Sequence, residues 1–180
     1  MRREAYQAIK ERLQRLVVAD SGEVVVLTEQ ALSELKEGDT EPNYAIKHIR
    51  LWNRQVEYIE GEIPFQLPAI FIEFGEMVWQ HKCGGTQFAP VQITLHVLSS
   101  AVIEGYPGDT FHLDLLDSIN ICLHGMQSSS IGSLARVSSQ PCHDHEEILD
   151  NIEVFEAIIY DSPTLKSYTA IEVDINLDLG

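Results

Sequence analysis

The sequence predicts an α+β fold: a mostly antiparallel β-sheet with an N-terminal helix and a central helix packed on one face. Segments with strand-like patterns outnumber helical ones and follow each other along the chain, which favours antiparallel pairing. The regular alternation of strand and helix that builds a doubly wound parallel sheet is absent. Because 180 residues suffice for one domain with a substantial core, we expect a single domain over residues 1–180.

The first third of the chain carries the weaker patterns. Apolar residues at helical spacing predict a helix over residues 3–18, which the Asp20-Ser21-Gly22 cluster ends. The β-branched run from Glu23 to Thr28 predicts an extended segment, and Ala31 to Leu35 fit one helical turn. Residues 44–64 have mixed periodicity, compatible with a strand at Val56–Glu60, and Trp52 is expected in the core.

The first clear strand pair follows Pro68. Proline at a strand entrance is tolerated, and the apolar run Ala69–Phe74 predicts a strand covered on both faces. Residues 87–99 alternate apolar and polar side chains, as a strand with one buried face does. We expect the two strands to form a long hairpin whose tip, at His81–Thr86, contains Gly84 and Gly85.

A helix over Phe111–Leu123 comes next. Asp109 or Thr110 can cap its first N–H groups, and Gly125 stands where a helix commonly ends. The residues expected on its buried face are Leu113, Leu116, Ile119, Asn120 and Leu123.

A second strand pair is predicted at residues 134–142 and 152–160, joined by a polar turn at His143–Asn151. A last strand, at 170–179, alternates strictly from Ile171 to Leu179. Two strand pairs with one helix between them are the best-defined part of the sequence.

Charge is the strongest compositional feature, with a formal net charge of −16. Residues 1–54 hold nine acids and nine bases, whereas residues 55–180 hold nineteen acids and only three bases. Backbone binding of nucleic acid requires clustered Lys and Arg, so specific nucleic-acid binding is not expected. An anionic membrane surface is disfavoured for the same reason.

The remaining composition points to the cytoplasm. No apolar run approaches the roughly 20 residues that span a bilayer, and the N-terminus lacks a signal-peptide pattern. Three cysteines, at 83, 122 and 142, fit reduced thiols better than a disulfide framework. We expect Cys122, within the predicted helix, to be a small buried hydrophobe.

The best metal candidate is Cys142-His143-Asp144-His145, followed by Glu146 and Glu147. Cysteine, histidine and carboxylate are all zinc ligands, but structural zinc sites usually combine two separated pairs. A second pair would have to come from Cys83 with His81, or from His112 with His124. A solvated polar turn explains the segment without metal, so no metal site and no cofactor is expected.

The sequence offers only weak candidates for a nucleophile, a phosphate-binding loop or a carboxylate site. Ser128–Ser130 lie in no nucleophile-elbow motif, and a loop explains them. The glycines at 84, 85, 105 and 108 match no phosphate-binding fingerprint, although Gly108 precedes a helix. Glu172, Asp174 and Asp178 share one face of the last predicted strand, where a solvated edge is the simpler interpretation. We therefore expect no catalytic residues and no enzyme.

The order of elements resembles that of the tail-terminator, or tail-completion, proteins of long-tailed bacteriophages and prophages. The resemblance covers about residues 5–162 and rests on element order, the proline-led strand Leu67–Phe74, the long strand Val91–Val97 and the helix at Phe111–Leu123. It includes the paired strands that end in Phe155–Pro163. That family has no catalytic motif to compare.

The resemblance implies a structural virion-assembly subunit that forms a homo-oligomeric ring, usually six-fold, on the end of the tail tube. Such a ring stops tail polymerisation and presents a surface for joining the head, so tail tube protein and head–tail connector proteins are the implied partners. The implied location is the bacterial host cytoplasm and then the virion tail. Two alternatives remain: an acidic cytoplasmic protein-interaction domain, and a zinc-dependent enzyme that uses Cys142, His143 and His145.

Overall fold

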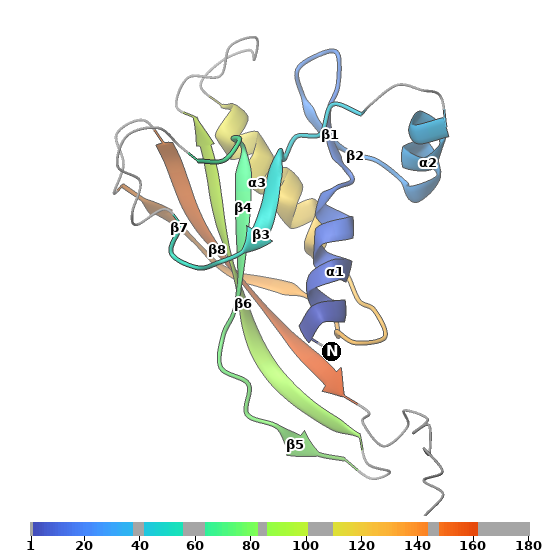
Figure 1. Cartoon of the computed structure of the whole chain (residues 1–180), viewed down its shortest axis with the longest axis vertical. Coiled ribbons are helices and arrows are strands. Elements are labelled where there is room, and N and C mark those ends of the chain that lie inside the picture. Colours follow the sequence, from blue (N-terminus) through green and yellow to red (C-terminus); the bar gives the residue numbers. More distant parts are fainter. Residues whose placement is uncertain are drawn as a thin grey trace, which may run out of the picture.

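The fold of this protein, in a computed structural model, is α+β, as the sequence predicts (Figure 1). Three expected features lie outside the residues that the structure describes: the strand at Val56–Glu60, the glycine pair of the hairpin tip and the strand at 170–179. The described residues are 2–37, 42–55, 64–82, 86–100, 110–143 and 148–161.

The main sheet has the strand order β3-β4-β6-β8-β7, with the short strand β5 paired to the start of β6. Among its described strands every pairing is antiparallel except that of β3 with β4, so the predicted mostly antiparallel sheet is confirmed. The predicted hairpin is present as β4 and β6, and the second strand pair as β7 and β8. The strands are β3 (His48–Leu51), β4 (Ala69–Phe74), β5 (Gln80–His81), β6 (Gln87–Ser100), β7 (Ala135–Cys142) and β8 (Ile148–Asp161).

The N-terminal region differs from the prediction at the end of its first helix. Helix α1 spans Arg2–Leu13, and Leu16–Val18 form strand β1, which pairs antiparallel with β2 (Val24–Val26). The expected helix over 3–18 is therefore too long. Leucine and valine fit either element in isolation, and pairing with the β-branched run of β2 selects the strand. Helix α2 spans Glu29–Glu37.

Helix α3 spans Phe111–Leu123, as predicted, and Gly125 takes a positive φ of 74° just beyond its end. The predicted buried face is wrong at Leu113, whose exposed fraction is 60%. Thr110 does not cap the backbone; its hydroxyl donates to Asp114. The buried stripe is rotated because α3 packs against the sheet and α1 through a different set: Phe111, His112, Leu115, Leu116, Ser118, Ile119, Cys122 and Leu123.

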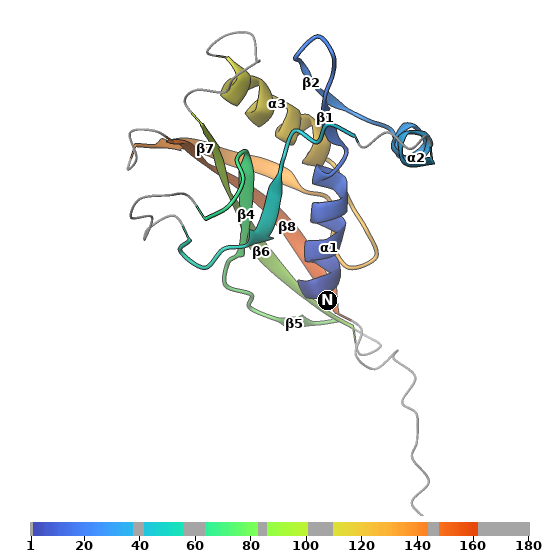
Figure 2. The same cartoon turned by 45° about the horizontal axis from the view of Figure 1, so that its top comes forward.

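Helices α1 and α3 lie on the same side of the sheet, as Figures 1 and 2 show. Their apolar side chains form one core with the inward-facing residues of the central strands, such as Ile72, Leu95 and Phe155. Cys122 of α3 is buried in this core, as expected, and burial raises the pKa of its thiol to about 11. Its Sγ donates to the carbonyl of Arg12, which ties α3 to α1.

The opposite side of the sheet is covered only in part. A small cluster that includes Phe71 and Leu98 lies beneath Trp52, Phe65 and Leu67, so β4 is buried on both faces, as predicted. Trp52 is half-buried, and it stacks on His96 with ring centroids 3.7 Å apart. Further along β6 and β8 the same side of the sheet is exposed. Among the described helices, none is both long and apolar enough to cross a bilayer.

Candidate functional site

The structure describes the candidate metal site only in part. Cys142 ends β7 opposite Asp150, His143 is exposed, and His145 lies outside the described residues together with Cys83. His112 and His124 stand at opposite ends of α3, and His81 is exposed in β5. Within the described part of the chain, no three His, Cys, Asp or Glu side chains are grouped so that they could hold a metal ion.

Of the other candidate segments, the structure describes only the loop of Ser128–Ser130. Ser128 and Ser130 contact each other through their hydroxyls at 3.4 Å, and the carbonyl of Ser130 accepts a hydrogen bond from the amide of Tyr160. This hydrogen bond places the loop of Ser128–Ser130 beside β8. Gly105, Gly108 and the carboxylates at 172, 174 and 178 lie outside the described residues.

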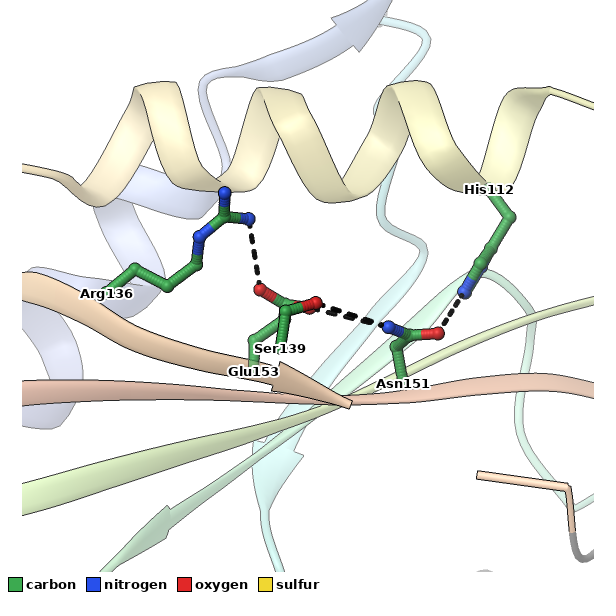
Figure 3. Close-up of polar contacts among 5 residues, drawn as sticks. All are labelled: His112, Arg136, Ser139, Asn151 and Glu153. Atoms are coloured by element: carbon green, nitrogen blue, oxygen red, sulfur yellow. Dashed lines mark hydrogen bonds and ion pairs between the residues drawn. The ribbon is translucent and has the colours of Figure 1, made fainter. Parts of the chain in front are cut away.

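A chain of polar side chains, most of them buried, lies between α3 and the strands β7 and β8 (Figure 3), and sequence reasoning did not predict it. It begins at Arg136, whose Nη1 lies 3.2 Å from Oε2 of the fully buried Glu153. The hydroxyl of Ser139 donates to Oε1 of the same carboxylate, and Nδ2 of Asn151 lies 3.5 Å from it. A buried carboxylate is stable as an anion only with such partners.

The chain continues to the helix through His112. A carboxylate only accepts hydrogen bonds, so the NH₂ of Asn151 faces Glu153 and its Oδ1 faces the imidazole. Nε2 of His112 lies 3.3 Å from that oxygen and must donate to it. Nδ1 lies 2.8 Å from the hydroxyl of Ser99, and it accepts from that hydroxyl when the ring is neutral. With His112 neutral, every pair in the chain has one donor and one acceptor.

The electrostatics of His112 agree with a neutral ring. Burial lowers the pKa of His112, and this effect outweighs the hydrogen bond that the ring donates to Asn151 and the charges of Asp150 and Glu153, all of which raise the pKa. The ring is therefore uncharged near neutral pH. Ser99, His112 and Asn151 are residue types that serve in active sites as nucleophile, base and orienting group. Ser99 is fully buried, however, so no substrate can reach its hydroxyl, and the chain acts to join α3 to the sheet.

A signal for this network exists in the sequence of β8. Every second residue of β8 faces the core. At these positions Ile159 and Phe155 are apolar, whereas Glu153 and Asn151 are polar. Polar residues in register with a buried apolar face indicate an internal network. Their partners Ser99 and His112 come from β6 and α3, and only the fold brings them there.

We expect the protein to lose stability in mild acid through His112. Its folded pKa lies below its unfolded value, so the unfolded chain binds the proton first as the pH falls. The contribution is complete above about pH 6.5 and is lost below it, with a slope of at most about 1.4 kcal/mol per pH unit for one proton. Urea unfolding between about pH 5.5 and pH 7.5 measures this slope.

The matched variant for this measurement is His112→Asn, which should have a shallower slope over that range. His48 also has a lowered pKa, caused by burial and then by the charges of Arg50 and Lys10, and it remains in the variant. The difference between the two slopes therefore isolates His112. Equal slopes would contradict a neutral, buried imidazole.

A groove of about 760 Å³ lies on the side of the sheet that faces away from α1 and α3. We call it the acidic groove. Pro90 of β6 and Ile158 and Tyr160 of β8 supply its apolar floor, and Ile158 is 38% exposed. Glu76 and Glu156 are the charged side chains among its described lining residues. Its walls are the segments that follow β4 and precede β7.

No protein-family model matches the sequence, and no curated protein matches it. One similar solved structure is a chain of the virion of a native gene transfer agent particle. It shares 12% sequence identity with this chain, the match covers 87% of this chain and 94% of that one, and the TM-score is 0.47. A likeness at this level establishes neither a common fold nor a common function.

Proposed function

We propose that the protein is a structural tail-completion subunit of a phage or prophage. In this role it assembles into a ring on the end of the tail tube, stops tail polymerisation and presents the surface to which the head is joined. The observation that carries the proposal is the acidic groove: exposed apolar side chains gathered on an uncovered sheet face are typical of a protein–protein contact surface. The element order of the tail-terminator family is the second support.

The charge distribution supports the same role. With nineteen acids and three bases beyond residue 54, most of the chain carries a field that repels nucleic acid. DNA that leaves a capsid through a tail has to pass the terminal ring without being retained. A subunit that lacks basic clusters meets this requirement.

The test is assembly in the presence of tail tube protein. We expect closed rings by negative-stain electron microscopy, and shorter tubes of more uniform length when the protein is added during polymerisation. Light scattering should report a mass that is a multiple of the 20.3 kDa chain. A strict monomer at high concentration, with unchanged tube length, would instead favour an unrelated acidic interaction domain.

A zinc enzyme predicts a different result. Elemental analysis of protein purified without added metal would then show near-stoichiometric zinc, lost in the His143→Ala, His145→Ala double variant. We expect no stoichiometric zinc, because His143 is exposed and no metal-binding group is present among the described residues.

A further inference from the structure

We propose that the acidic groove binds the basic edge of a second copy of this chain, and that this head-to-tail contact builds the ring. The basic edge is the exposed surface of β3 and its flanks, formed by Lys47, Arg50 and Leu51. The inference rests on the proposed function and specifies which two surfaces of the subunit meet.

The acidic groove needs a partner with both apolar and positive groups. Ile158 and Tyr160 leave apolar surface exposed on its floor, and no segment of the described chain covers it. Glu76 and Glu156 place two carboxylates in the lining, without a base among the described lining residues. Glu156 makes one contact of its own, with Nε2 of Gln92 at 3.4 Å. Complementary charge sets the orientation and rate of association at such a surface.

The basic edge has that composition. Residues 42–55 contain Lys47, Arg50 and Arg54 and not a single acid, in a chain whose net charge is −16. Lys47 and Arg50 are exposed, and Leu51 beside them is 52% exposed. Strand β3 is the last described strand on its side of the sheet, so this edge is presented outward. An exposed leucine flanked by cations matches an apolar floor flanked by carboxylates.

The two surfaces lie on different parts of one subunit, which makes the contact heterologous. The acidic groove lies over β6 and β8, whereas the basic edge lies at β3, beyond β4. Contacts between two different patches propagate from copy to copy, and they close into a ring when the rotation between copies permits. One pair of patches is therefore sufficient to generate the assembly.

The experiment reverses one charge on each surface. Glu156→Arg and Arg50→Glu should each raise the apparent dissociation constant of the assembly roughly tenfold or more, as measured by sedimentation velocity. The matched controls are Asp117→Arg on α3 and Arg3→Glu on α1, which change the net charge equally at exposed positions outside both surfaces. The controls should assemble like the wild type.

Mixing the two variants provides the decisive step. The arginine introduced at position 156 of one variant then faces the glutamate introduced at position 50 of the other. The native pair Arg50 and Glu156 forms at the next contact, so assembly should return with alternating subunits. Such alternation closes only rings with an even number of subunits. The single chain that carries both Glu156→Arg and Arg50→Glu should also assemble.

A photo-crosslinking amino acid in place of Tyr160 identifies what occupies the acidic groove. Mixtures of isotope-labelled and unlabelled chains should give cross-links between copies, to peptides that contain residues 47–54. Cross-links to residues 162–180 of the same chain, or to another surface, would overturn the inference.

The outcomes separate this inference from the proposed function. Rings that resist both charge reversals would overturn the inference and leave the tail-completion role in place. A wild-type chain that forms dimers and grows no further would overturn the head-to-tail contact. A wild-type chain that stays monomeric, alone and with tube protein, would overturn both.

Discussion

Replacing Arg136 by methionine should lower the free energy of unfolding by about 2–3 kcal/mol. The change removes the cation that lies 3.2 Å from Glu153 and leaves a fully buried carboxylate with only the hydroxyl of Ser139 and the amide of Asn151 as described donors. Desolvation of the remaining charge, more than loss of the contact, causes the effect. Because 29% of the Arg136 side chain is exposed, we place the value just below the range for fully buried pairs. Urea unfolding at neutral pH measures it.

The chain offers a matched control in Arg15. Its Nη2 lies 3.1 Å from Oε2 of Glu29, nearly the same separation, but the Glu29 side chain is 84% exposed. Arg15→Met should therefore cost less than about 1 kcal/mol. In addition, Glu153→Met combined with Arg136→Met should destabilise by less than the sum of the two single changes. Equal costs at Arg15 and Arg136 would show that burial of the carboxylate is not the cause.

Leu115→Ala should lower the free energy of unfolding by about 3 kcal/mol, because a fully buried leucine loses its contacts and leaves a cavity between α3 and the core. Leucine and alanine have similar helix propensities, so the backbone contributes little to the change. Thermal or urea unfolding provides the value.

Leu113 serves as the control, since it lies two residues away on the same helix and is 60% exposed. Leu113→Ala should cost about 0.5 kcal/mol or less. A large effect at Leu113 with a small one at Leu115 would restore the buried face that the sequence predicts and contradict the observed packing of α3.

The elements that the sequence predicts correctly are those with strong local patterns. Strand β4 is a nearly continuous apolar run, and helix α3 is bounded by Thr110 and Gly125, so both were recognisable without partners. The strand Leu16–Val18 was not recognisable, because its apolar residues also continue the helical spacing of α1. The pairing of β1 with β2, which is a contact between separate segments, selected the strand.

The candidate sites divide in the same way, into features that local sequence indicates and features that contacts between separate segments create. Sequence motifs indicated the cluster at Cys142 and His143, which the described residues do not assemble into a metal-binding group. The network from Ser99 through His112 to Glu153 was not predicted, since its members lie on β6, α3, β7 and β8 and none is adjacent in sequence to its partner. The acidic groove was missed because its exposed apolar residues are ordinary members of alternating strands.

Local sequence was enough to set the class of fold, most of the strands, the central helix and the excess of acids beyond residue 54, because periodicity, turn residues and charge can all be read without knowing the partners of a segment. Packing between distant segments set which face of α3 is buried, which polar residues share the interior and where the sheet stays open. The free energies of those contacts outweigh the small local preferences of individual residues.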